Sequence, residues 1–138
     1  MTKQIEDGME LLSTEECERL LGAGGVGILA LRGVEAPVLR PVNFVLNDGW
    51  LMIRTGIGQI FEAADSAQPA SFVFSNTDAV EHTGWSVVVS GRLLEHRKVM
   101  ESPNIPLRPW TRAEKDNYVG LSIVEITGRR IAPLGSFT

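Results

Sequence analysis

The chain has 138 residues, of which 43% are hydrophobic, and a formal net charge of −4 at pH 7. This length suits a single domain with its own core, and the acidic balance argues against nucleic acid as a partner. No apolar run is long enough to cross a membrane and no signal segment opens the chain, so we expect a cytoplasmic protein without membrane contacts. Cys17 is the single cysteine, which excludes an internal disulfide and a cysteine-based zinc site.

The first ten residues are polar and lack a periodic pattern, so residues 1–10 are predicted to be a flexible arm before one domain that covers 11–138. The domain opens with a helix-start signal, in which Ser13 is the predicted N-cap and Glu16 completes a capping box. The helix is predicted to end at Gly22. Cys17 lies on its apolar face and is expected to be a core residue rather than a nucleophile.

Short runs rich in β-branched residues predict an antiparallel β domain. The connections between the runs are too short for crossover helices, and Asn47-Asp48-Gly49 is a hairpin signal. Pro41 cannot donate a ladder hydrogen bond, so its strand is predicted to be at an edge or bulged there. The predicted strands cover residues 26–31, 38–46, 50–55, 70–75, 83–93 and 118–127.

The segments between these strands are also assigned. A second helix is predicted after Gly58, because apolar residues recur there at helical spacing, and it ends before Pro69. Residues 76–82 are predicted to be a polar loop and residues 96–117 an irregular segment. The sequence thus predicts a mainly β fold with two or three short helices, and hairpin-linked short strands favour a closed barrel over an open sheet.

The run at residues 83–93 is the strand around which the others are expected to pack. Its alternation places Trp85, Val87 and Val89 on a fully apolar face and Ser86 on the opposite face. Gly91 predicts a bulge or the close approach of another group to the backbone. This run can be read as a core strand with a tryptophan plug, or as a strand that also presents Trp85 and Ser86 to a ligand.

Residues 54–59 are the first candidate site for chemistry. Arg54 and Thr55 end a strand, and a glycine-containing turn leads into a helix, an arrangement that suits a phosphate monoester. Arg40 and Asn43 form a second candidate, able to donate to a heterocycle or a phosphate. Because they lie on opposite faces of a strand, one direct partner cannot bind both unless Pro41 introduces a bulge. The plain alternatives are a surface turn and a solvated arginine.

Metal and triad chemistry are weakly supported. His82 and His96 lie too far apart for a helical metal pair, and no carboxylate cluster accompanies them, so no metal site is predicted. No nucleophile elbow is present, and no residue is named as catalytic.

Four motifs occur together at residues 40–44, 51–55, 84–91 and 127–131. In this order they resemble the pyridoxamine 5′-phosphate oxidase-like family of flavin-binding proteins, and more narrowly its small single-domain branch. The resemblance implies a split β-barrel and a homodimer with FMN in a cleft at the subunit interface. It assigns the FMN phosphate to Arg54 and Thr55, with Arg40 on the phosphate side.

The resemblance also implies positions around the flavin ring. It places Val42, Asn43 and Phe44 along the isoalloxazine, with Trp85 and Ser86 closing the site. The implied function is an FMN-dependent oxidoreductase of unknown substrate, in which the cofactor carries the chemistry.

Two departures from the family pattern qualify this expectation. Gln59 stands where the family commonly has a lysine that pairs with the phosphate, so FMN binding is expected to be weak or FMN to be replaced by deazaflavin or haem. A haem would need His82 or His96 as its axial ligand. A barrel without a cofactor, acting as a ligand-binding or structural dimer, is a further alternative. The chain also has no Arg-x-His motif, so it is not expected to be a true pyridoxamine phosphate oxidase.

Overall fold

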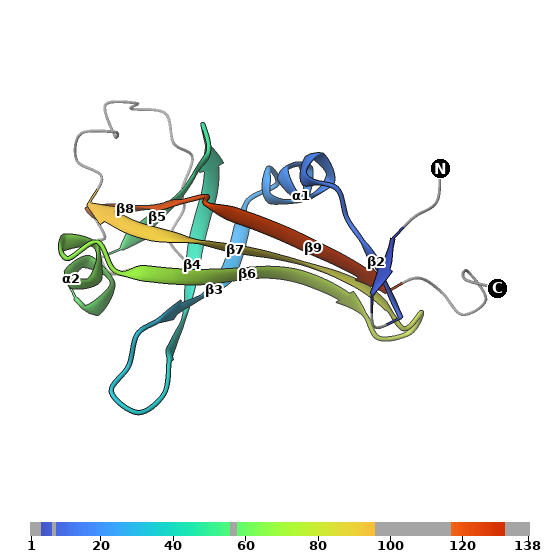
Figure 1. Ribbon diagram of the computed structural model, residues 1–138, viewed down its shortest axis with the longest axis horizontal. Helices are drawn as coiled ribbons and strands as arrows, with labels where there is room; N and C mark the ends of the chain where they lie inside the picture. Colours follow the sequence, from blue (N-terminus) through green and yellow to red (C-terminus); the bar gives the residue numbers. More distant parts are fainter. Residues whose placement is uncertain (1–3, 7, 56–57, 96–116, 132–138) are drawn as a thin grey trace.

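The computed structural model describes residues 4–6, 8–55, 58–95 and 117–131 of the chain (Figure 1). Two helices and nine strands occur in these residues: β1 Ile5–Glu6, β2 Met9–Leu11, α1 Thr14–Leu21, β3 Gly25–Leu31, β4 Val38–Asn47, β5 Trp50–Thr55, α2 Gln59–Asp65, β6 Pro69–Asp78, β7 Thr83–Glu95, β8 Asn117–Ser122 and β9 Glu125–Ile131. Among the described residues, neither helix has the length and apolar character needed to cross a membrane.

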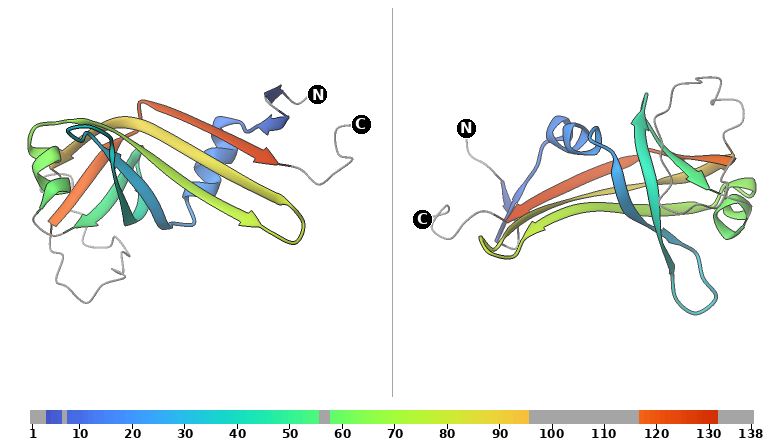
Figure 2. Two further views of the ribbon diagram at one scale, coloured as in Figure 1. Left: turned by 90° about the horizontal axis from the view of Figure 1, so that it is seen from below. Right: turned by 180° about the vertical axis from the view of Figure 1, so that it is seen from behind.

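Six strands close into an antiparallel barrel, in the order β7–β6–β3–β4–β5–β8 and back to β7. The predicted mainly β fold and closed barrel are confirmed. Strands β9, β2 and β1 continue the sheet from the other half of β7, outside the barrel. Figure 2 shows β6, β7 and β9 reaching beyond the barrel toward the N-terminal hairpin, while α2 lies at the opposite end of the molecule.

One edge of β7 is divided between two strands. Its first part, Gly84 to Ser90, pairs with β9, and its last part, Leu93 to Glu95, pairs with β8. At the change of partner, a Cβ on Gly91 would overlap the carbonyl oxygen of Ser122. The predicted close approach to Gly91 is therefore confirmed, and it is an approach of backbone to backbone.

The prediction of one final strand over residues 118–127 is wrong. The chain forms β8 and β9 there, because it bends at residues 123–124 and changes its position along β7. Two hydrogen bonds fix the bend: the Val124 N–H donates to the Ser90 carbonyl at 3.0 Å, and the Arg92 N–H donates to Ser122 Oγ at 2.9 Å. Both partners lie far away in sequence, so the local pattern contains no sign of the break.

The fourth strand is longer than predicted. Strand β6 continues to Asp78, where the sequence indicated a loop from residue 76 onward. Its ladder with β7 runs to the pair Asp78–Thr83. Asp78 Oδ1 then accepts the N–H groups of Val80 and Glu81 at 2.9 and 3.1 Å, which closes the turn. The polar residues of this segment are exposed because the hairpin extends past the barrel.

Aromatic rings form a continuous row in the core. Phe44 makes edge-on contacts with Phe72 and Phe74, each with centroids 4.8 Å apart, and Phe74 contacts Trp85 at 5.4 Å. Val87 and Val89 lie beside this row and are fully buried. The predicted apolar face of β7 is thus confirmed as the inner face of the sheet.

Pro41 lies opposite Ile28 of β3, while the ladder between β4 and β5 begins only at Phe44. Pro41 therefore occupies a stretch of β4 that has a strand partner on one side alone. This agrees with its predicted position at an edge, since the missing N–H removes no bond from a second ladder.

The N-terminal residues are more ordered than the sequence indicates. Where a flexible arm was predicted, β1 and β2 form a short hairpin, and β2 pairs with β9. Glu10 is 6% exposed, and its Oε1 lies 3.6 Å from Nη1 of Arg130. An ion pair to a distant strand and an available sheet edge order this segment, and neither is visible as a local periodicity.

The predicted capping box of α1 is confirmed. Glu16 N–H donates to Ser13 Oγ at 3.2 Å, and Ser13 N–H reaches Glu16 Oε1 at 3.5 Å. Replacing Ser13 by alanine removes an acceptor for the first turn of the helix. We expect this substitution to lower the free energy of unfolding by about 1 kcal/mol, measured by urea denaturation at pH 7.

The matched control for Ser13→Ala is Thr14→Ala, a change at the neighbouring exposed position inside the helix. Equal losses in the two variants would contradict the capping role.

The hydrogen bond from the Ser13 backbone N–H, with help from Ser13 Oγ and Arg130, lowers the pKa of Glu16. A lowered pKa in the folded state contributes stability at neutral pH that is lost as the pH falls through that pKa. The stability difference between the wild type and Glu16→Gln should therefore shrink on acidification.

Candidate functional site

The end of the barrel beside α2 holds a direct contact between two predicted site residues. Arg40 lies on β4 and Gln59 is the first residue of α2, and both are exposed. Arg40 Nη2 donates to Gln59 Oε1 at 3.1 Å, and Nη1 donates to the Leu39 carbonyl at 3.1 Å. The sequence named these two residues separately, and the structure brings them together.

Arg54 and Thr55 end β5 and face in opposite directions. Thr55 is 8% exposed and belongs to the same alternation as the buried residues Leu51 and Ile53. Arg54 is half-buried on the other face, where its guanidinium carbon lies 5.9 Å from the ring centroid of Tyr118. Residues 56 and 57, which complete the predicted anion-binding turn, lie outside the described residues.

The three residues expected along the flavin ring divide between the two faces of β4. Val42 and Phe44 are 8% and 2% exposed and pack into the core of the barrel. Asn43 is half-buried on the outer face, opposite Val26 of β3. Of these three side chains, Asn43 is the one that the fold leaves on the outside of the barrel.

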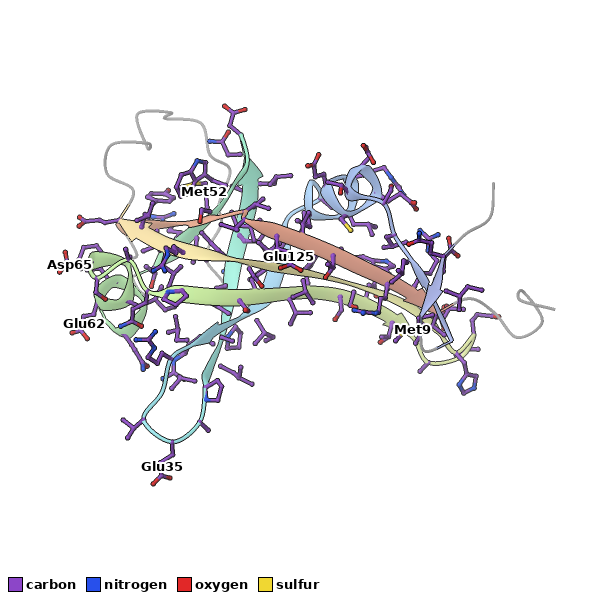
Figure 3. The ribbon with its side chains drawn as sticks, in the orientation of Figure 1. Met9, Glu35, Met52, Glu62, Asp65 and Glu125 are labelled. Carbon is purple, nitrogen blue, oxygen red and sulfur yellow. The ribbon has the colours of Figure 1, made fainter. Side chains whose placement is uncertain are left out.

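Trp85 and Ser86 lie far from α2, near the beginning of β7. They occupy opposite faces, with Trp85 on the inner face against Phe74 and Ser86 on the outer face opposite Ser75. Trp85 also lines an open groove with a volume of about 560 Å³, which Arg130 borders on β9. Figure 3 shows how far apart these ends are, with Glu62 and Asp65 on α2 at one side and Met9 of β2 at the other.

A single chain therefore holds two separate groups of predicted site residues. Arg40, Gln59, Arg54 and Thr55 lie around the junction of β5 and α2. The connection that follows α2 contacts the C-terminal half of β7 through a hydrogen bond from Leu93 N–H to the Gln68 carbonyl. Trp85 and Ser86 belong to the other end of the same strand.

Arg130 and Arg40 differ in how far their partners compensate their charge. Arg130 is bound by two carboxylates, since its Nη2 lies 3.3 Å from Glu16 Oε2 in addition to the contact with Glu10. Arg40 donates to two neutral oxygens and so keeps its positive charge uncompensated by these contacts. The motif at residues 127–131 contributes to the resemblance to the family, but it did not indicate that Arg130 of β9 would form ion pairs with Glu10 of β2 and Glu16 of α1.

Other chemistry finds little support in the described part of the chain. No group of three or more histidine, cysteine, aspartate or glutamate side chains could hold a metal ion there. His96 lies outside the described residues, and His82 is exposed in the turn between β6 and β7. Cys17 is 1% exposed, and burial raises the pKa of its thiol, which fits a core residue rather than a nucleophile.

The space beside Gly58 fits an anionic group. Among the described residues, no heavy atom lies within 4 Å of a Cβ built on Gly58, at the start of α2. The Arg40 guanidinium donates to the side chain of Gln59, the residue that follows Gly58. A cation that retains free N–H donors beside open backbone is an arrangement that suits a phosphate.

Comparison with known protein families gives a match over most of the chain. Residues 13–130 match the family model described as pyridoxamine 5′-phosphate oxidase. The chain belongs to this family. The resemblance inferred from the four sequence motifs is thereby confirmed, as is the split β-barrel fold.

Two relatives of this family are similar over nearly their whole lengths. An uncharacterized protein of Mycobacterium tuberculosis is 29% identical over 87% of this chain and 84% of its own. The structure of the FAD binding protein from Mycobacterium smegmatis is 28% identical, with a TM-score of 0.73 over 88% of this chain and 99% of that one.

A third relative has been solved from Corynebacterium glutamicum, a candidate pyridoxamine 5′-phosphate oxidase. It is 26% identical, with a TM-score of 0.72 over 92% of this chain and 96% of that chain. The residues matched by the family model, 13–130, include the six barrel strands and nearly all of β9.

Proposed function

We propose that this protein is a flavin-binding oxidoreductase of the cytoplasm, that its cofactor is FMN and that its substrate is not pyridoxamine phosphate. The observation that carries the proposal is the hydrogen bond from Arg40 to Gln59 at the start of α2, in a member of a family with a flavin-binding relative. The absence of an Arg-x-His motif supports a substrate other than pyridoxamine phosphate.

In this proposal Arg40, Gln59, Arg54 and Thr55 hold the phosphate end of the flavin. Asn43 lies on the outer face of β4, and the regular ladder with β3 leaves no bulge at Pro41, so Asn43 would not contact the same flavin directly as Arg40. The bound flavin would supply two-electron redox chemistry, and the side chains would supply binding and orientation. No side chain needs to act as a general acid or base for hydride transfer to the cofactor.

FAD is the second candidate cofactor, and the FAD binding protein from Mycobacterium smegmatis favours it. FAD carries a diphosphate and an adenosine in addition to the part shared with FMN. A site that relies on Arg40 alone for the phosphate end would bind FMN and FAD with similar affinity, whereas contacts to the adenosine would make FAD bind more tightly.

The test is a titration of the purified apoprotein with riboflavin, FMN and FAD, followed by flavin fluorescence. We expect saturable quenching by FMN, and riboflavin binding that is weaker by at least about tenfold because riboflavin lacks the charged phosphate. Tighter binding of FAD than of FMN would assign the cofactor to FAD. A protein that binds none of the three would overturn the proposal, and deazaflavin and haem would then be titrated.

We also propose that the protein is a homodimer with its cofactor cleft between the subunits. The outer face of the barrel supports this proposal. One row across four neighbouring strands is apolar, and the next row is uncharged: Val88, Val73, Ile28 and Pro41 form the first, and Ser90, Ser71, Ala30 and Leu39 the second. Glu125 and Arg129 of β9 border this face, giving the uncharged centre and charged rim that protein interfaces have.

The separation of the site residues also favours a second copy of this chain as the occupant of that face. Arg40 and Gln59 lie at one end of β7, and Trp85 and Ser86 lie at the other. A cofactor that contacts both groups would receive them from two different subunits. Ser86 is on the outer face, where a partner subunit would reach it.

Replacing Val73 by lysine tests the dimer. Val73 is half-buried in the middle of the apolar row, between Ile28 and Val88. A lysine there would lie unpaired in the interface, and we expect the dimer dissociation constant to rise by at least about a hundredfold. Light scattering coupled to size-exclusion chromatography measures the change from dimer to monomer.

Val80→Lys is the control, because Val80 is 84% exposed in the turn between β6 and β7. This variant adds the same charge away from the outer face and should remain a dimer. A wild-type protein that is monomeric at high micromolar concentration, or a Val73→Lys protein that stays dimeric, contradicts the proposal.

A further inference from the structure

Gln59, the first residue of α2, accepts a hydrogen bond from Arg40 of β4. Arg40 Nη2 and Gln59 Oε1 are 3.1 Å apart, and the two residues come from different elements of the fold. A lysine at residue 59 has no acceptor and could not make this contact. A lysine in place of Gln59 would therefore remove the contact that orients Arg40 and would add a positive charge at residue 59.

The guanidinium of Arg40 is fixed at two nitrogens. Nη1 donates to the Leu39 carbonyl at 3.1 Å while Nη2 donates to Gln59, so both acceptors are uncharged. A guanidinium has five N–H donors in a planar fork, which leaves donors for an anion. An exposed arginine without the second contact would sample many rotamers and would lose that freedom on binding.

The contrast with Arg130 shows why neutral acceptors matter. Arg130 is bound by Glu10 and Glu16, so its charge is compensated within the protein. Gln59 orients Arg40 without compensating its charge. A glutamate in place of Gln59 would keep an acceptor for Arg40 but would compensate the positive charge of its guanidinium. A lysine would place a second positive charge beside Arg40.

We propose that Gln59 is a positioning residue for Arg40, and that Arg40 supplies the positive charge for the flavin phosphate at the place where Gln59 holds it. This inference rests on the proposed flavin-binding function and assigns residue 59 an indirect role. It predicts that Gln59 affects flavin affinity only while Arg40 is present. It also predicts that Gln59→Lys does not bind FMN more tightly than the wild type.

A double-mutant cycle tests the proposal with FMN titrations of the wild type, Gln59→Ala, Arg40→Met and the double variant. We expect Gln59→Ala to weaken FMN binding by about fivefold, the effect of one lost hydrogen bond, and to have less than about a twofold effect when Arg40 is already methionine. Gln59→Glu should weaken FMN binding more than Gln59→Ala does, although it retains the acceptor. Gln4→Ala, an exposed glutamine near the N-terminus, is the control and should bind FMN like the wild type.

The outcomes separate the two proposals. Equal losses from Gln59→Ala with and without Arg40 would show that Gln59 contacts the phosphate directly, and a tighter complex in Gln59→Lys would show that a cation at residue 59 is tolerated beside Arg40. Either result overturns the positioning role and leaves flavin binding intact. A wild type that binds no flavin overturns the proposed function, and the role of Gln59 falls with it. Thermal melting of each apoprotein checks that a lost affinity is not a lost fold.

Discussion

Replacing Gly91 by alanine is expected to destabilise the protein by about 3 kcal/mol, the upper range for forcing extra atoms into a packed structure. Gly91 lies on the inner face of β7 at the point where this strand changes its partner from β9 to β8. The new Cβ would overlap the carbonyl oxygen of Ser122, which is backbone and cannot rotate away. Urea denaturation followed by tryptophan fluorescence measures the loss.

Gly58→Ala is the control for this prediction. Gly58 has φ 164°, an extended conformation open to any residue, and no heavy atom lies within 4 Å of its Cβ position. Its replacement should leave the free energy of unfolding within about 0.5 kcal/mol of the wild type. If Gly91→Ala were as stable as Gly58→Ala, then β8 would not lie against Gly91.

Reversing the charge of Arg40 is expected to have the largest effect on the proposed cofactor. Arg40→Glu removes a charge-assisted hydrogen bond to the phosphate and places a carboxylate beside it, and we expect FMN binding to weaken by roughly two orders of magnitude. Gln59 would then lose its donor as well. Fluorescence titration at constant ionic strength measures the dissociation constant.

Arg32→Glu makes the same change of net charge on the exposed connection between β3 and β4, and it serves as the control. This variant should bind FMN within about twofold of the wild type, because Arg32 takes no part in the contact between Arg40 and Gln59. Unchanged binding by Arg40→Glu, with loss of binding by Arg54→Glu, would move the phosphate to the side of β5 that Arg54 and Tyr118 share.

The features of the fold that depend on neighbouring residues could be predicted from the sequence. The capping box at Ser13 and Glu16, the turn after Asn47 and the alternation along β7 each involve contacts within a few residues or a simple period. The β4–β5 hairpin occurs where the sequence indicated it, with β5 over the residues expected. Closure of the barrel followed from the number of short hairpin connections.

The features that depend on contacts between residues far apart in the chain could not be predicted from the sequence. The break between β8 and β9 is set by hydrogen bonds from residues 92 and 124 across to the other strand, and the hairpin of β1 and β2 is held by the ion pair of Glu10 with Arg130. The sequence contains the residues that make such contacts, but it does not show which residues pair with one another. These two regions, together with the longer β6, are where prediction and structure differ.

The candidate site also combines features that could be predicted from the sequence with features that could not. The motifs at residues 40–44 and 54–59 named the residues, because each motif is a local run. They did not indicate that Arg54 and Thr55 face opposite sides of β5 or that Val42 and Phe44 lie in the core. The contact of Arg40 with Gln59 joins two motifs, and it required the three-dimensional arrangement of β4 and α2.

The divided edge of β7 has a consequence for how the protein opens. The β9–β2–β1 extension is joined to the barrel strands through β7, which pairs with β9 along its first part and with β8 along its last part. The barrel cannot separate from the N-terminal extension while this strand stays paired, so the two should lose their structure in one cooperative step. Backbone amides near Val87 and Val89 should then exchange with deuterium only through global unfolding, whereas those of β1, at the far end of the sheet, exchange by local fraying.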